Sequence, residues 1–313
     1  MDGNAYRREG SGVGRVSASL ITVAAAAFAL GAAADEGSAT SPQAVPDAGQ
    51  RVVLVTGSTS GLGREVARTL TGQGDHVIVH GRSIERGEAL VSEITAAGGS
   101  ARFYAADFAS LPQVREFAQA ILRDYPRLDV LVNNAGIWLQ PEDGRMTNPA
   151  GVEMHFQVNY VAGYLLTELL LPRLRESAPS RIVNVASAAQ RPIDWDDVMM
   201  ETGYSDGRGY AQSKLAQVIH AFELAERLAD AGIIVNSLHP ATMMDTNMVL
   251  SRGASTRASV DEGRDAVLHL VNSPDLGTGL YFTGTRETRA NDQAYDLAAR
   301  ARLMELSQRL VGG

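Results

Sequence analysis

The sequence predicts an α/β fold in which seven parallel strands form one doubly wound sheet. Three observations predict this fold. From Arg51 onward, short runs rich in β-branched residues alternate with segments of helical length. No linker interrupts the alternation, and no internal repeat divides it. Because right-handed crossovers join successive parallel strands, this alternation indicates a single domain over residues 51–313.

The expected strands are apolar runs of about five to seven residues, as is typical of strands buried on both faces. In chain order they are RVVLVTG (51–57), HVIVHG (76–81), ARFYAAD (101–107), LDVLVNNAG (128–136), RIVNVAS (181–187), IIVNSLHP (233–240) and GLYFTG (279–284). The segments between them are long enough for helices, which we expect at 62–73, 84–97, 111–124, 151–177 and 208–231, with a last amphipathic helix near 291–310.

Residues 1–50 are expected to be an extension and linker outside the domain. Residues 17–34 are uncharged, follow three arginines and end in small residues before Asp35, which is the order of a secretory signal peptide. The same stretch is long enough for a weakly apolar membrane anchor. A disordered extension and a start site placed too far upstream are the alternatives. Residues 35–49 have the Ser, Pro, Gly and Ala content of a linker.

Composition excludes several classes of function. The net charge of −8 argues against a nucleic-acid-binding protein, which would carry a basic face. The absence of cysteine excludes disulfides, thiolate metal sites and cysteine nucleophiles, and we expect no metal site. The expected partner is therefore a small molecule. Contact with a membrane is expected only if 17–34 is an anchor, and a homo-oligomer is left open.

A glycine-rich loop predicts a dinucleotide site beyond the carboxyl ends of the strands, where doubly wound sheets bind ligands. In TGSTSGLG (56–63), Gly57 permits a tight turn, Gly61 lets the backbone approach a pyrophosphate, and Gly63 allows close packing of helix and strand. The N-terminus of the following helix favours phosphate. The spacing G-x3-G-x-G differs from the commonest fingerprint. The residues expected to bind the cofactor here are Gly57, Ser58, Ser60, Gly61, Leu62 and Gly63.

The end of the second expected strand indicates which dinucleotide is bound. An acidic residue there favours NAD, because it binds the ribose 2′-OH. This chain has Arg82 at that place and no carboxylate before Glu85. A guanidinium can hold a 2′-phosphate through two hydrogen bonds, so we expect NADP(H) rather than NAD(H). The alternative is that Arg82 is simply solvated.

Tyr210 and Lys214 are four residues apart in an expected helix and therefore lie on one face. A tyrosine with the ordinary pKa of about 10 is a poor base at neutral pH. A neighbouring ammonium stabilises the phenolate and lowers that pKa, which makes a usable general acid and base. Lys214 is the single lysine among 28 basic residues, which indicates a task that arginine cannot perform. The alternative is an ordinary surface pair.

The motifs TGSTSGLG, NNAG (133–136), NVAS (184–187) and YAQSK (210–214), in this order and spacing, resemble those of the short-chain dehydrogenase/reductase family. The resemblance covers essentially residues 51–313 and implies a Rossmann fold with hydride transfer between a nicotinamide and a carbonyl or alcohol. Within the family, HFQVNYVAGYLLTELLLPRL (155–174), DWDDVMMETGYSDGRGYAQSKLA (194–216) and LMELSQRLVG (303–312) resemble the retinol-dehydrogenase-like branch.

The resemblance implies catalytic roles for four residues. Tyr210 exchanges a proton with the substrate oxygen, and Lys214 lowers the pKa of Tyr210 and holds the nicotinamide ribose. Ser187 donates a hydrogen bond to the substrate oxygen, and Asn159 holds a proton-relay water near the lysine. For the cofactor, the resemblance further implies contacts with Asp107, Phe108, Asn134, Ala135, Gly136 and Pro240.

Simpler structural interpretations stay open for three of these residues. Ser187 could satisfy a backbone group at the end of its strand, Asn159 could cap or kink its helix, and Asp107 could be the N-cap of the helix that begins near Ser110. The sequence also departs from the family pattern. Alanine replaces the first of the usual two serines, Ala241 replaces a usual glycine, and Thr246 lies about one residue later than the usual threonine.

The resulting prediction is an NADP-dependent oxidoreductase of a lipophilic carbonyl or alcohol. The segment 241–260, with Met243, Met244, Met248, Val249 and Leu250, is expected to form an adaptable apolar lid, unless these residues pack into the core or a subunit interface. A non-catalytic NADP-binding sensor on the same fold is the alternative. A cytoplasmic location is favoured because NADP is a cytosolic metabolite, and an exported or membrane-tethered enzyme is the other case.

Overall fold

An eight-stranded sheet of order β3-β2-β1-β4-β5-β6-β7-β8 forms the centre of the computed structural model, which describes residues 44–312. All seven expected strands are present and parallel, and β8 is an unpredicted two-residue strand antiparallel to β7. The strands are β1 (Val52–Val55), β2 (His76–Gly81), β3 (Ser100–Ala105), β4 (Val130–Asn133), β5 (Ser180–Val185), β6 (Ile233–His239), β7 (Tyr281–Thr283) and β8 (Arg286–Glu287).

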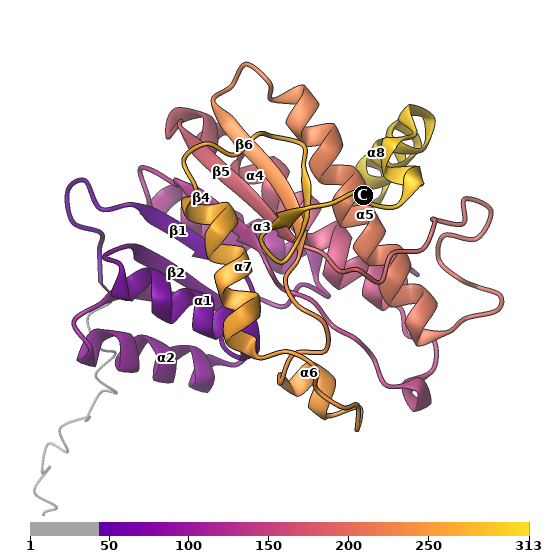
Figure 1. Cartoon of the computed structure of the whole chain (residues 1–313), viewed down its shortest axis with the longest axis horizontal. Helices are drawn as coiled ribbons and strands as arrows, with labels where there is room; N and C mark the ends of the chain where they lie inside the picture. Colours follow the sequence, from indigo (N-terminus) through magenta and orange to yellow (C-terminus); the bar gives the residue numbers. More distant parts are fainter. Residues whose placement is uncertain (1–43, 313) are drawn as a thin grey trace, which may run out of the picture. The chain divides into compact units, whose positions relative to one another are not determined.

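Helices cover both faces of this sheet (Figure 1). Successive residues of β1 point to opposite faces, so Val52 and Leu54 belong to one core, and Val53 and Val55 belong to another. The first core is closed by α3 (Leu111–Asp124), α4 (Ala162–Glu176) and α5 (Asp206–Arg227), and the second by α1 (Gly61–Gly72), α2 (Ile84–Ala96) and α7 (Val260–Asn272). The expected doubly wound arrangement is therefore confirmed.

The direction of chain progression reverses at β1, which lies between β2 and β4. From β1 the chain adds β2 and β3 on one side, and it then adds β4, β5 and β6 on the other side. A crevice opens at such a switch point, beyond the carboxyl ends of the strands. The loop that follows β1 and the loop that follows β4 meet there.

The expected helix over 151–177 differs from the structure. Residues Phe156–Val161 form a π-helical segment, η2, and the α-helix α4 begins only at Ala162. A single π-helical turn inside a helix frequently marks a functional site. Asn159 lies in this segment.

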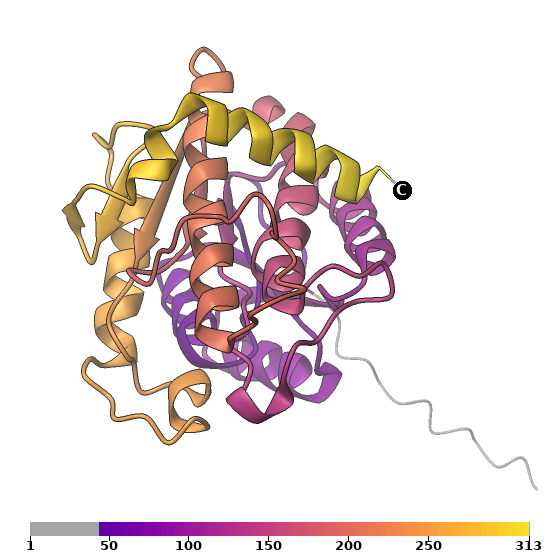
Figure 2. The same ribbon diagram turned by 90° about the vertical axis from the view of Figure 1, so that its right-hand side faces the viewer.

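The C-terminal helix α8 (Leu297–Val311), preceded by the 3₁₀ turn η3 (Asp292–Tyr295), packs on α5 and η2 (Figure 2). The Tyr160 and Ser307 hydroxyls are 2.6 Å apart, and Arg300 pairs with Glu223 and Glu226 of α5. A third hydrophobic cluster, which includes Tyr160, Leu215 and Leu303, lies at this contact. It supports the outer side of the helix that carries Tyr210 and Lys214.

Two helices between β6 and β7 were not predicted. The short helix α6 (Asn247–Leu250) lies within 241–260, where the sequence indicated only a lid, and α7 begins at the end of that segment. A capping box, in which Ser259 and Glu262 bond each other's backbone N–H groups, begins α7. The 3₁₀ turn η1 (Pro141–Asp143) after β4 is also unpredicted.

The N-terminal segment 17–34 lies outside the described residues. The residues that are described belong to one compact unit. Within that unit, no helix has the length and apolar character that crossing a membrane requires.

Candidate active site

A cavity of about 490 Å³ lies at the switch point, beyond the carboxyl ends of β1, β4, β5 and β6. It brings together most of the residues singled out in the sequence. These are Gly57, Ser60, Gly61, Leu62, Gly63, Arg82, Asp107, Phe108, Asn134, Ala135, Gly136, Ser187, Tyr210, Lys214 and Pro240. Ser58 and Asn159 are the two expected residues that do not line it.

The glycine loop has the close approaches that a phosphate cradle requires. Gly57 and Gly61 adopt φ of +65° and +52°, a region that favours glycine. A Cβ on Gly57 would lie 2.8 Å from the Ala135 Cα, so the loops after β1 and β4 touch there. A Cβ on Gly63 would lie 2.5 Å from the Gly57 carbonyl oxygen. Backbone rather than side chains therefore faces this end of the cavity.

The helix α1 points its N-terminus toward the cavity and is suited to an anion. Its N-cap residue, Ser60, makes no side-chain capping bond, and its first turn contains no acidic residue. Free N–H groups and the positive end of the helix dipole therefore face the cavity.

Ser58 supports the glycine loop from inside. Its hydroxyl donates to the Val55 carbonyl at 2.7 Å and accepts from the His80 N–H at 3.0 Å. His80, which the sequence reasoning missed, accepts the Gly57 N–H at Nδ1 and lies 3.2 Å from the Ala106 carbonyl at Nε2. Burial lowers the pKa of His80 to about 4, so the ring is neutral and can accept this bond.

Two arginines border the cavity at the end of β2. Arg82 and Arg86 are both exposed, and neither pairs with a carboxylate of the described residues. Arg86 was not predicted, although it lies four residues after Arg82, at the start of α2. The two guanidiniums can converge on one phosphate.

Asp107 also lines the cavity, two residues after the end of β3. Its carboxylate accepts the Ala109 N–H at 3.0 Å, and the N-cap of α3 is Ser110. The alternative that Asp107 caps α3 is therefore wrong. Phe108 is buried and stacks on the His80 ring at a centroid distance of 4.4 Å.

Tyr210 and Lys214 lie one turn apart on α5, and the Lys214 Nζ is 5.7 Å from the centroid of the Tyr210 ring. Nζ donates to the Val185 carbonyl and to Gln217 Oε1, each at 2.9 Å. Burial lowers the pKa of Lys214 to about 7. Burial also raises the pKa of Tyr210, and a hydrogen bond with the Ser187 side chain lowers it. Lys214 is not among the causes of this shift, and burial opposes the lowering that was expected from it.

Ser187 follows β5 and faces the cavity. Its hydroxyl accepts the Ala189 N–H at 3.1 Å, and its carbonyl accepts the Tyr281 hydroxyl at 2.9 Å. Ser187 therefore bonds the local backbone, as the simpler interpretation expected, and it also lines the cavity. Neither of these two bonds uses the hydroxyl proton of Ser187, which can be donated to Tyr210 or to a ligand.

Asn159 is buried beneath the cavity. Its Oδ1 accepts the Ile137 N–H at 2.7 Å, and its Nδ2 donates to the Ile137 carbonyl and the Ser213 hydroxyl. A Cβ on Gly136 would lie 3.3 Å from Asn159 Oδ1 and 3.5 Å from Lys214 Nζ. The amide therefore ties the segment after β4 to α5, and the part of Asn159 in a proton relay stays a prediction.

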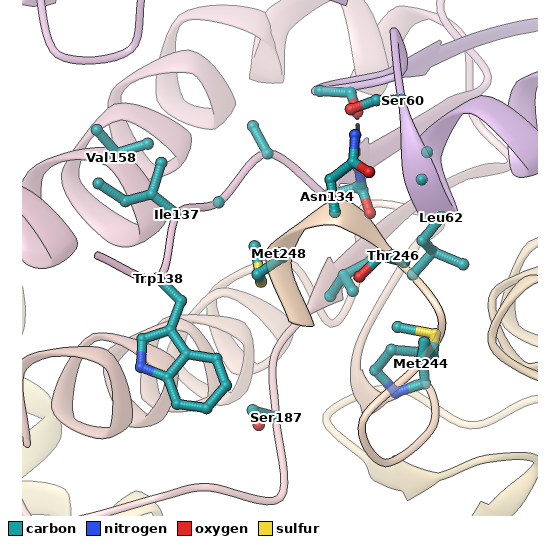
Figure 3. Close-up of a pocket in the computed structure, with 18 of the residues that line it drawn as sticks. Ser60, Leu62, Asn134, Ile137, Trp138, Val158, Ser187, Met244, Thr246 and Met248 are labelled. Carbon is teal, nitrogen blue, oxygen red and sulfur yellow. Dashed lines mark hydrogen bonds between the residues drawn. The ribbon is translucent and has the colours of Figure 1, made fainter. Parts of the chain in front are cut away.

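The other half of the cavity is largely apolar (Figure 3). Trp138, Ile137, Val158, Met248 and Val249 line it, and the Trp138 ring stacks on Tyr210 at a centroid distance of 5.2 Å. Apolar walls beside a tyrosine and a serine suit a lipophilic molecule with one oxygen.

The expected lid divides into residues that face the cavity and residues that do not. Met244 lines the cavity beside Leu62 and also packs toward Gly263, and Met248 projects into the cavity (Figure 3). Leu250 is 53% exposed and does not line the cavity. The displaced Thr246 lies against Gly61, 3.3 Å from the position of a Cβ there, so it still reaches the glycine loop.

The cavity holds no arrangement that suits a metal. Among the described residues, no group of three His, Cys, Asp or Glu side chains could ligate one. The cavity instead suits an anionic dinucleotide, because backbone groups, a helix N-terminus and two arginines line its phosphate end.

The chain was compared with families, relatives and solved structures. A family model described as short chain dehydrogenase matches residues 51–256. Retinol dehydrogenase 13 of Homo sapiens is 36% identical over 316 aligned positions, which cover 94% of this chain and 93% of that protein. Retinol dehydrogenase 14 of Mus musculus is 36% identical over 84% of this chain and 86% of its own length. A short chain dehydrogenase of Escherichia coli CFT073, solved with NADPH, has a TM-score of 0.61 at 26% identity and covers 78% of this chain and 99% of its own.

Proposed function

The chain belongs to the short-chain dehydrogenase family and its retinol-dehydrogenase-like branch, and on that premise we propose that it is an NADP-dependent oxidoreductase with Tyr210 as general acid and base. It transfers a hydride between nicotinamide and a carbonyl or alcohol carbon. The observation that carries the proposal is that Ser187, Tyr210 and Lys214 share one cavity with the glycine loop.

Tyr210 and Ser187 act on the substrate oxygen. When bound, the nicotinamide supplies the hydride in reduction or accepts it in oxidation. In reduction, the Tyr210 hydroxyl donates its proton to the carbonyl oxygen. The Ser187 hydroxyl donates a hydrogen bond to the same oxygen and stabilises the negative charge that develops on it. In oxidation, Tyr210 accepts the proton of the alcohol.

Lys214 stabilises the phenolate that Tyr210 becomes. Burial lowers the pKa of Lys214 from its ordinary value to about 7. A negative charge on Tyr210 favours the ammonium form, and the ammonium in turn lowers the free energy of the phenolate. Two of its N–H groups are used by Val185 and Gln217. The third is available to the ribose of the cofactor.

The preference for NADP is assigned to Arg82 and Arg86. Both border the cavity where the adenosine ribose would lie, and the carboxylate that usually selects NAD is absent at the end of β2. The solved E. coli relative carries NADPH. These observations support NADP(H) over NAD(H).

A lipophilic alcohol or aldehyde is the proposed substrate class. Trp138, Met248 and Val249 line the half of the cavity beside Tyr210. The relatives are named retinol dehydrogenases, and retinol is such an alcohol. We assign the enzyme to the cytosol, where NADP is available. N-terminal sequencing of the full-length protein after cell fractionation tests this, and a terminus near Asp35 in an exported fraction would contradict it.

A substrate screen with NADPH and NADH in parallel tests the proposal. We expect NADPH oxidation with lipophilic aldehydes or ketones, and a lower kcat/KM with NADH. NADPH binding without turnover on any substrate would instead favour a non-catalytic sensor. Preference for NADH would overturn the role of Arg82 and Arg86.

A further inference from the structure

Arg252, which follows α6, connects three segments at the substrate half of the cavity. Its Nη1 donates to the Leu139 carbonyl in the segment after β4. Its Nη2 pairs with Asp206 Oδ2 at 2.5 Å. Asp206 is the first residue of α5, one turn before Tyr210. One side chain thus joins parts of the chain that are 46 and 113 residues distant in sequence.

The same guanidinium covers an aromatic stack. Its central carbon is 4.0 Å from the centroid of the Trp138 ring, and Trp138 stacks on Tyr210 at 5.2 Å with an interplanar angle of 28°. The Arg252 side chain is only 11% exposed. A cation over an indole face stabilises more when both are shielded from water.

The segment that carries Trp138 is also held from beneath. The Leu139 N–H donates to His155 Nε2 at 3.1 Å, and His155 Nδ1 lies 2.7 Å from Glu153 Oε1. Glu153 and His155 are fully buried, and the His155 ring meets the Tyr210 ring edge-on at 6.4 Å. Both backbone groups of Leu139 are therefore engaged, its N–H by His155 and its carbonyl by Arg252.

Arg252 is placed to act through other residues rather than on a ligand. It is not among the residues that line the cavity, and its charge is paired with Asp206. A substrate carboxylate would have to displace that pair. The geometry points to a positioning role instead.

We propose that Arg252 is a positioning residue that clamps Trp138 against the ring of Tyr210 and so directs the Tyr210 hydroxyl at the substrate oxygen. The clamp also holds the segment of Met248 and Val249, which line the cavity, because Arg252 lies three residues after Val249. Only the catalytic consequence rests on the proposed function. The placement of Trp138 is a separate claim.

The placement is tested by the fluorescence of Trp138. The chain has two tryptophans, so Trp195→Phe leaves Trp138 as the single one. In that background, with NADPH absent, we expect Arg252→Gln to raise the acrylamide quenching constant of Trp138 by about twofold or more, since the cation that covers one face of the ring is removed. An unchanged quenching constant would overturn the clamp, whether or not the protein turns over any substrate.

The catalytic consequence is tested by the kinetics of the full chain. Misplacement of a reacting group by about 1 Å can cost about 100-fold in rate. We expect Arg252→Gln to lower kcat by about 10- to 100-fold, with the Kd for NADPH within about twofold of the parent, because Arg252 does not border the cavity. Arg252→Lys keeps the charge but not the fork, and should recover part of the loss.

Arg302→Gln is the matched control, because Arg302 lies over Trp195, at 5.2 Å, away from the cavity. It should leave kcat unchanged. A loss of NADPH binding in Arg252→Gln equal to the loss in kcat would mean general damage and would contradict the positioning role. If the parent turns over nothing, the proposed function fails, and the quenching result still decides whether Arg252 places Trp138.

Discussion

Substitution of Gly63 by alanine tests the phosphate cradle at its tightest point. A Cβ at this position would lie 2.5 Å from the Gly57 carbonyl oxygen, 2.5 Å from Asn134 Nδ2 and 3.0 Å from the Ser58 Cα. An ordinary contact between such atoms is about 3.5 Å, so the loop after β1 and the start of α1 must separate by about 1 Å. Overpacking of this kind costs about 1–3 kcal/mol.

Two measurements follow from this displacement. At about 2–4 °C per kcal/mol for a domain of this size, the Tm should fall by about 2–12 °C. The Kd for NADPH, measured by the enhancement of nicotinamide fluorescence on binding, should rise by at least about tenfold, because the same backbone forms the phosphate site.

Gly72→Ala is the control within the same helix. A Cβ on Gly72 meets nothing within 4 Å, and this residue ends α1. Alanine should therefore leave the Kd for NADPH unchanged and stabilise the helix by at most about 1 kcal/mol. If Gly63→Ala binds NADPH as the parent does, the loop is not the phosphate cradle. A lower Tm with an unchanged Kd would leave it a packing position only.

Three further predictions concern the charged groups of the cavity. Arg82→Ala should lower the preference for NADPH over NADH by about 10- to 100-fold in kcat/KM, the loss of one or two charge-assisted hydrogen bonds; an unchanged ratio would assign the 2′-phosphate elsewhere. Lys214→Arg, conservative in charge, should lose most of its kcat, because the 4% exposed site holds Nζ between Val185 and Gln217 and has no space for a planar fork; normal turnover would refute this. Burial lowers the pKa of Lys214 to about 7 in the folded protein. Between pH 7 and the ordinary lysine pKa, the unfolded state therefore binds one more proton than the folded state. The free energy of unfolding should rise with pH over about 7.5–9.5, by up to about 1.4 kcal/mol per pH unit. Lys214→Met should lose this rise in urea titrations, and an identical slope in both proteins would contradict the lowered pKa.

The regular part of the fold could be predicted from the sequence because buried parallel strands are continuous apolar runs. The expected strand 76–81 coincides with β2, and the expected helix 111–124 coincides with α3. The π-helical segment around Asn159 could not be predicted, because its residues have the same apolar pattern as the α-helix that follows. The helix α7 carried a signal that was overlooked, the Ser259 and Glu262 capping box.

Site residues that belong to a local sequence motif could be predicted. Site residues that act through contacts between distant parts of the chain could not. The glycine loop, Tyr210 and Lys214 all line the cavity, as their motifs indicate. His80 supports Gly57 from the neighbouring strand, and Arg252 reaches Leu139 from 113 residues away. No spacing in the sequence marks such pairs.

The expectation for Tyr210 shows a different limit. Spacing alone indicated that Lys214 lowers the pKa of Tyr210. In the folded protein, burial raises the pKa of Tyr210. The Lys214 Nζ donates its hydrogen bonds to Val185 and Gln217 instead. Helical spacing places two groups on one face, and their environment decides the sign of the shift.

The central claim is that Tyr210 exchanges a proton with the substrate, and single-turnover NADPH oxidation by Tyr210→Phe tests it most directly. The phenylalanine keeps the ring that stacks on Trp138 and removes only the hydroxyl. With an aldehyde that the parent reduces, the variant should bind NADPH with the Kd of the parent and oxidise it at least about 100-fold more slowly, as the loss of a general acid requires. Oxidation at the rate of the parent would show that Tyr210 is not the acid and base of this site.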